Sequence, residues 1–134
     1  MEEDYEANYH KAREVVALEL VSRYGLVESY RDDYKLSLDS DEYSIHLSFY
    51  IPYCDELYVS KIVDNEPLGE SFRELLYNIY PESENARKVL KKIFSPLKHV
   101  QESERYSESV LIRSFLIKVS FLEDNFPQYF NLIT

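Results

Sequence analysis

The sequence predicts a single α+β domain over residues 1–134, with an N-terminal helix, a three-stranded antiparallel meander and then three or more C-terminal helices. Three observations support this fold class. The chain has 134 residues, which is enough for one hydrophobic core and too few for two domains. Apolar residues recur at helical spacing up to residue 24 and again after residue 66, and between these regions they alternate with a period of two.

The first predicted element is an amphipathic helix over residues 4–24. Its apolar side chains recur every three or four positions, at Tyr5, Tyr9, Ala12, Val15, Val16, Leu20 and Tyr24. Acidic residues crowd its first turn, where the positive end of the helix dipole favours them. Gly25 is suited to end the helix, because glycine readily adopts the left-handed backbone conformation found at helix C-termini.

The meander begins with a strand predicted over residues 26–38. One face of this strand is formed by Leu26, Tyr30, Tyr34, Leu36 and Leu38. Asp32 falls on the same apolar face, where a carboxylate does not belong. We therefore expect a β-bulge or a local change of register at Asp32.

Two further strands complete the predicted meander. Residues 39–42 have the composition of a turn, and residues 43–51 alternate strictly between apolar and polar, which predicts the second strand. Residues 54–56 predict another turn, and residues 57–63 predict the third strand. The one-sided alternation indicates an antiparallel sheet with one covered face.

Helical spacing returns after the meander. Residues 68–79 predict a short helix, with Ser71 and Glu74 as its N-terminal cap. A second helix is predicted from Ser83 until Pro96 bends or stops it.

The last predicted helix covers residues 110–124, where the apolar residues share one side of a helical wheel. Its many β-branched residues leave a strand open as the alternative over 110–122. The aromatic segment 126–130 is expected to pack onto the domain.

Composition argues against several classes of function. Two glycines cannot build a phosphate-cradling loop, and the lone Cys54 cannot form an intrachain disulfide. His10, His46 and His99 belong to separate elements without metal-ligand spacing, so we expect no metal and no cofactor. Three strands and four helices leave little room for a catalytic cleft, so we do not expect an enzyme.

We also expect neither a membrane nor a nucleic acid as partner. The chain starts without a secretory signal and has no run of 18 uncharged apolar residues, which predicts a cytoplasmic protein. One face of a predicted helix is basic, with Arg87, Lys88, Lys91 and Lys92. Such a face is typical of a helix exposed to solvent and does not by itself indicate nucleic-acid binding. The formal net charge of −10 repels phosphate.

Charge and tyrosine are concentrated in the first half of the chain. Residues 1–66 hold 16 acidic and 6 basic residues, whereas residues 67–134 hold 9 of each. The first half also holds 9 of the 13 tyrosines. Carboxylates attract a basic partner, and exposed tyrosines supply rigid contact area, so this half predicts a surface for a basic protein.

In size, acidity and order of elements the chain resembles the small acidic immunity proteins of bacterial toxin–immunity systems. Three segments of the chain fit this resemblance: residues 39–42 (DSDE), 43–46 (YSIH) and 122–127 (LEDNFP). The resemblance implies that the chain binds and neutralises a cognate toxin, with basic nucleases among the candidates. The alternative is an acidic type III secretion chaperone that binds an effector, a family with a second group of strands between its last helices.

The predicted partner-binding residues are Asp39, Asp41, Glu42, Tyr43, Asp64, Glu66 and Tyr5. They meet at one end of the domain if the first helix runs antiparallel to the first strand, because its N-terminus then lies near the 39–42 turn. The opposite end, with Tyr30, Asp32 and Asp33, is the second candidate surface. The sequence leaves open whether the chain is a monomer or a dimer.

Overall fold

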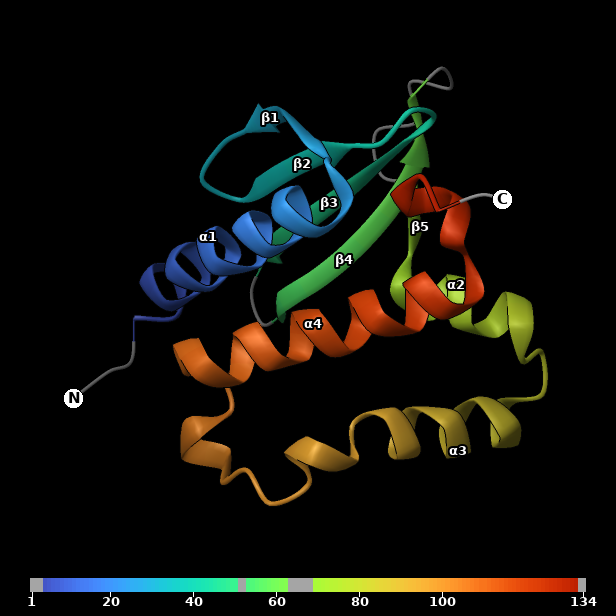
Figure 1. The fold of residues 1–134 in the computed structure, drawn as a ribbon. Coiled ribbons are helices and arrows are strands. Elements are labelled where there is room, and N and C mark those ends of the chain that lie inside the picture. The colour runs from blue at the N-terminus through green and yellow to red at the C-terminus, as the bar shows by residue number, and fades with distance from the viewer. Residues whose placement is uncertain (1–3, 51–52, 63–68, 133–134) are drawn as a thin grey trace.

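The structure is a computed structural model, and it describes residues 4–50, 53–62 and 69–132. These residues form an α+β fold with an antiparallel sheet and four α-helices (Figure 1). The helices are α1 (Tyr5–Tyr24), α2 (Phe72–Ile79), α3 (Ser83–Ile93) and α4 (Glu108–Asn125). The strands are β1 (Val27–Arg31), β2 (Lys35–Asp39), β3 (Tyr43–Tyr50), β4 (Tyr53–Lys61) and β5 (Glu70–Ser71).

The core lies between the sheet and the pair α1 and α4, which pack against each other and against the strands (Figure 1). Helix α3 lies beyond α4. The largest fully buried side chains include Tyr9, Leu20, Leu36, Leu38, Ile45, Leu47, Leu57, Phe115 and Phe130. Ile45, Leu47 and Phe49 are buried, as predicted for the second strand, but Ser44 and His46 on its other face are buried as well.

The expected number of three strands is wrong. The sheet has five strands in the order β1-β2-β3-β4-β5, so each strand pairs with its neighbour in the sequence as in a meander. The strand predicted over residues 26–38 is in fact the hairpin of β1 and β2, with Val27 opposite Asp39 and Arg31 opposite Leu36. The irregular register expected at Asp32 lies instead between Glu28 and Tyr30.

Local hydrogen bonds explain why the chain reverses at Asp32. The Asp32 Oδ1 atom accepts hydrogen bonds from the backbone N–H groups of Tyr34 and Lys35, each at 2.8 Å. The Asp32 N–H in turn donates to the Lys35 carbonyl at 2.8 Å. This is the turn that an aspartate side chain stabilises by bonding to the backbone two residues later.

The turn predicted at residues 54–56 is wrong as well, because these residues belong to β4. Their acidic composition is overridden by tertiary contacts: Cys54 is buried, and Asp55 forms an ion pair with Lys118 of α4. The short strand β5 was not predicted; it pairs Glu70 with Val59 of β4. The end of the predicted third strand, at residue 63, lies outside the described residues.

The helical predictions are largely confirmed. Gly25 ends α1 with a φ of 67°, and Ser71 and Glu74 form the reciprocal cap of α2. Residues 110–122 are helical, as part of α4. The aromatic segment packs onto the domain, with Tyr129 and Phe130 buried.

Candidate functional site

The 39–42 turn presents only part of the predicted site. Asp41 and Glu42 are exposed. The Asp39 carboxylate accepts hydrogen bonds from the hydroxyls of Ser29 and Ser44, so it is engaged within the sheet. Tyr43 is half-buried, with its ring centroid 4.6 Å from that of Tyr129. Asp64 and Glu66 lie outside the described residues.

Tyr5 is not near the 39–42 turn. The Tyr5 ring packs against Tyr106 with centroids 5.0 Å apart, and one helical turn further along, the Tyr9 hydroxyl reaches the Tyr34 carbonyl at 3.2 Å. Helix α1 does run antiparallel to β1, but the chain reverses after β1. The N-terminal half of α1 therefore lies beside the 32–34 turn, at the opposite end of β2 from Asp39 (Figure 1).

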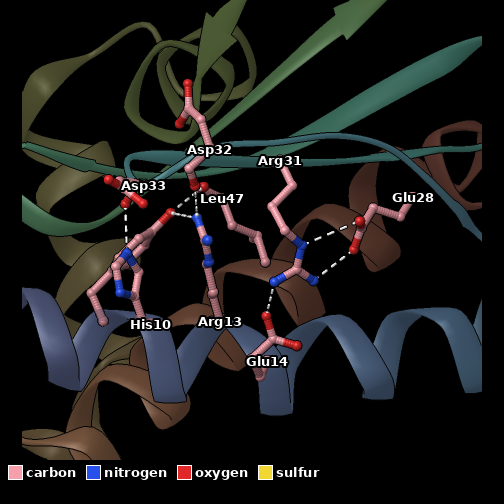
Figure 2. Close-up of polar contacts among 9 residues, drawn as sticks. His10, Arg13, Glu14, Glu28, Arg31, Asp32, Asp33 and Leu47 are labelled. Carbon is pink, nitrogen blue, oxygen red and sulfur yellow. Dashed lines mark hydrogen bonds and ion pairs between the residues drawn. The ribbon is translucent and has the colours of Figure 1, made fainter.

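Helix α1 holds the backbone of the 32–34 turn through two side chains (Figure 2). Arg13 Nη1 donates to the Asp32 carbonyl at 2.7 Å, and His10 Nε2 lies 2.7 Å from the Asp33 carbonyl. The Asp32 carboxylate holds the same turn from within, and its second oxygen accepts the Tyr30 hydroxyl at 2.6 Å. The Tyr30 hydroxyl and the backbone N–H of Tyr34 lower the pKa of Asp32, which keeps it ionised.

Arg13 is an unusual anchor because it is buried, with 5% of its surface exposed. Its Nη1 donates to the Tyr9 hydroxyl at 3.3 Å as well as to Asp32, whereas Nε has no hydrogen-bond partner among the described residues. Burial raises the pKa of Tyr9 to about 12, so the phenol stays neutral, and its hydroxyl donates to the Leu47 carbonyl at 2.7 Å. The turn is thus tied through Arg13 and Tyr9 to the centre of the sheet.

A second set of contacts ties β1 to α1 beside the turn (Figure 2). Arg31 forms ion pairs with Glu14 of α1 and, at 2.7 Å, with Glu28 of β1. The hydrogen bonds from Arg31 lower the pKa of Glu28. These charges offset one another, whereas the Asp33 side chain makes no hydrogen bond or ion pair with any residue that the structure describes.

The two most exposed of the described tyrosines, Tyr34 and Tyr30, lie at this turn. Among the tyrosines whose exposure is described, Tyr34 is 57% exposed, Tyr30 48% and Tyr5 41%, and all others are half-buried or buried. We call Tyr30, Asp32, Asp33 and Tyr34 the turn surface; Tyr5 packs against Tyr106 instead. The held carboxylate of Asp32 and the exposed carboxylate of Asp33 lie beside two exposed phenols, which suits a surface that binds positively charged groups and flat apolar groups.

Sequence reasoning missed His10 and Arg13 as the anchors of the turn. A signal for Arg13 was present, because it lies four residues after Tyr9 and between Ala12 and Val16, on the apolar side of the helix. A charged residue in that position needs a buried partner. Because the β1–β2 hairpin was not predicted, however, the Asp32 carbonyl could not be named as that partner.

His46 is the other polar group that could carry chemistry. Its Nδ1 lies 2.6 Å from the Ser37 hydroxyl and its Nε2 lies 2.8 Å from the Ser60 hydroxyl. Burial lowers the pKa of His46 to about 4, so it is a weak base for activating serine at neutral pH. The arrangement favours the hydrogen-bonded structural role.

Within residues 4–50, 53–62 and 69–132, no three His, Cys, Asp or Glu side chains are grouped closely enough to hold a metal ion. No described helix is both long and apolar enough to cross a membrane. The fold and the turn surface define a small α+β domain that presents a fixed acidic turn. No known protein family, curated protein or solved structure matches the chain.

Proposed function

We propose that this chain is a non-catalytic binding module that recognises a basic protein through the turn surface. The observation that carries the proposal is that the two most exposed described tyrosines, Tyr30 and Tyr34, flank Asp32 and Asp33. Tyrosines at the centre of an interface contribute more binding energy than most residues, because they bury a large rigid area and keep a hydroxyl for hydrogen bonding.

The anchored turn supports the same proposal. Binding costs entropy when a loop must first become ordered, and this turn is already held by Arg13, His10 and the Asp32 carboxylate. Asp33 and Tyr34 are then presented in a fixed position. The net charge of −10 attracts a basic partner over a longer range.

We propose as the partner a cognate bacterial toxin domain, which the chain binds and neutralises. Enzymes that cleave nucleic acids carry basic surfaces because they bind phosphate. An acidic surface of fixed geometry would occupy such a surface and block it. A nuclease toxin is therefore the partner of this class that best fits the charge of the chain.

The alternative, a secretion chaperone, is less well supported. That family's plan needs a second group of strands between the last helices. After Ser71, the regular elements of the described chain up to residue 132 are helices, including α4 over the segment for which a strand was open. This order of elements favours the immunity function over the chaperone.

Two charge-reversed variants with the same change in net charge test where the partner binds. Asp33→Lys alters the turn surface, and Asp41→Lys is the matched control at the exposed 39–42 turn. Each variant and the wild type are used to capture proteins from the organism that carries the gene, and the captured partner is then titrated by calorimetry. Asp33→Lys should raise Kd at least about tenfold, and Asp41→Lys should change it much less.

The proposal fails if Asp41→Lys weakens binding more than Asp33→Lys does, because the surface then lies at the 39–42 turn. It also fails if neither variant changes Kd, or if the captured partner is acidic. Coexpression separates the two functions: an immunity protein restores growth to cells that produce the partner, whereas a chaperone leaves its activity intact.

A further inference from the structure

A mostly apolar groove lies between α4 and the end of α3, which runs along this side of α4 (Figure 1). Its volume is about 460 Å³, and its wall on the α3 side is formed by Ile93 and Pro96. Of the described residues, none from the sheet or from α1 lines it. Six residues of α4 form the other wall: Arg113, Leu116, Ile117, Ser120, Phe121 and Asp124.

Four of these α4 residues form a straight row along the helix. Arg113, Ile117, Ser120 and Asp124 are spaced by four, three and four positions, which keeps them on one face. This spacing is that of the a and d positions of a coiled coil, the row that packs against a second helix. Arg113, Ser120 and Asp124 are exposed and Ile117 is half-buried, so the row is open to a helix from outside the described chain.

The row is complementary to a copy of itself. When two such helices pack antiparallel about a two-fold axis between residues 118 and 119, Arg113 of each copy lies opposite Asp124 of the other. Ile117 of each copy then lies opposite Ser120 of the other, and the apolar residues 116 and 121 flank the contact. Within one chain Arg113 and Asp124 are about 16 Å apart along the helix, too far to form an ion pair.

Both charged ends of the row can accept a further partner. Arg113 Nη2 donates to the Pro96 carbonyl at 2.9 Å, which holds the guanidinium at the groove and leaves its other N–H groups available. Asp124 makes no hydrogen bond or ion pair with any described residue. It also lies in the last turn of α4, where the helix dipole disfavours an acid, so α4 itself does not explain its position.

The remaining charged side chains near the groove do not alter this balance. Lys118 of α4 donates to Asp55 on the sheet side, and Glu123 accepts the Tyr24 hydroxyl. The basic residues of α3 are exposed and do not line the groove. The groove therefore holds one positive and one negative charge. The net charge of −10 repels a second copy at long range, but salt of about 0.15 M screens this repulsion beyond about 8 Å.

We infer that this groove is the interface of a homodimer, in which α4 of one copy packs antiparallel against α4 of a second copy. The apolar side chains of the two walls are removed from water, and an Arg113–Asp124 ion pair closes each end of the contact. The second copy supplies the required pattern of charges because it has the same sequence. The dimer does not rest on the proposed function, since no residue of the turn surface lines the groove.

Sedimentation velocity of the full chain at about 0.15 M salt tests the dimer. The wild type should dimerise with a Kd below about 0.1 mM. Arg113→Glu should raise that Kd at least about tenfold, because both symmetry-related ion pairs become pairs of carboxylates. Lys11→Glu is the matched control: it makes the same change of charge at an exposed position of α1, and it should leave Kd within about twofold.

Mixing two variants separates a lost interface from a damaged fold. Asp124→Lys should also dimerise weakly by itself, but an equimolar mixture with Arg113→Glu should restore the dimer, because every acid then lies opposite a base. The inference is overturned if the wild type remains a monomer up to about 1 mM, since the groove then serves another occupant or none. It is also overturned if Arg113→Glu weakens the dimer no more than Lys11→Glu does, or if the mixture dimerises no better than the separate variants.

Discussion

Two basic side chains of the described residues are almost inaccessible to solvent: Arg13, which is 5% exposed, and His46, which is 8% exposed. The polar groups of these two buried side chains find their partners in different ways. Arg13 donates to a backbone carbonyl, whereas His46, whose pKa is lowered by burial, is neutral between two serine hydroxyls. We therefore expect His46 to make the folding stability depend on pH, and Arg13 to determine how well the 32–34 turn is held.

Folding stability should depend on pH through His46. Its pKa is about 4 in the folded chain, because burial disfavours the charged form, and about 6.5 in the unfolded chain. Between these values the unfolded state binds a proton that the folded state does not bind. The free energy of unfolding should therefore fall by up to about 3 kcal/mol as the pH drops from about 6.5 to 4.

The measurement is urea unfolding of the wild type, His46→Gln and His99→Gln at pH 7 and pH 4.5. Because the carboxylates titrate in all three proteins, the informative quantity is the difference between them. His46→Gln should lose less stability on acidification than the wild type, and the exposed His99→Gln should behave like the wild type. Equal losses in His46→Gln and the wild type would contradict the role given to His46.

At the scale of the elements, the β1–β2 hairpin decides where the candidate site lies. The sequence predicted one strand over residues 26–38, because Leu26, Leu36 and Leu38 keep the same parity along it. Side chains alternate between the two faces in the same way along one long strand and along a hairpin with a short turn. The alternation therefore does not distinguish the two. Asp32 on the apolar face was the available signal, and its side chain indeed directs the turn.

The hairpin turn should depend on its anchor in α1. Arg13→Met keeps the length of the side chain but removes the donor to the Asp32 carbonyl. We expect amide hydrogen exchange at Tyr34 and Lys35 to become about tenfold faster or more, because a hydrogen bond from a charged group is lost. Exchange in β3 and β4 should change much less.

The matched control is Arg31→Met, which removes the ion pairs to Glu14 and Glu28 at the surface of the same hairpin. Surface pairs contribute little, so the turn amides should keep their protection. A uniform rise of exchange across all strands in Arg13→Met would mean that Arg13 stabilises the whole fold rather than the turn.

At the scale of the whole molecule, the uneven charge of the chain was predictable, but its position in space was not. The acidic first half was evident from composition alone. Placing the N-terminal half of α1 near Asp39 or near Asp33 required the strand order, because one missed chain reversal exchanges the two ends of the sheet. The same error concealed the exposure of Tyr30 and Tyr34, which a single long strand would have turned toward the core.

Association with the proposed basic partner should be fast at low salt and slow at high salt. The charge on the chain acts over about 10 Å at 0.1 M ionic strength and over much less at 1 M. The association rate constant should fall at least about tenfold between about 0.02 M and 0.5 M salt, with a smaller change in the dissociation rate. Stopped-flow mixing of the two purified proteins measures both, and a salt-independent association rate would exclude electrostatic steering.

The free edge of the sheet has a consequence for how the protein behaves when it is concentrated. Strand β1 ends the sheet, and all five of its residues are exposed. A flat edge strand is a template on which other chains can stack into aggregates, but this one has an irregular register at Ser29 and carries Glu28 and Arg31. The irregularity twists the backbone, and the charges must lose water before another strand can pair. The protein therefore leaves its edge open to solvent while making it a poor seed for fibril growth.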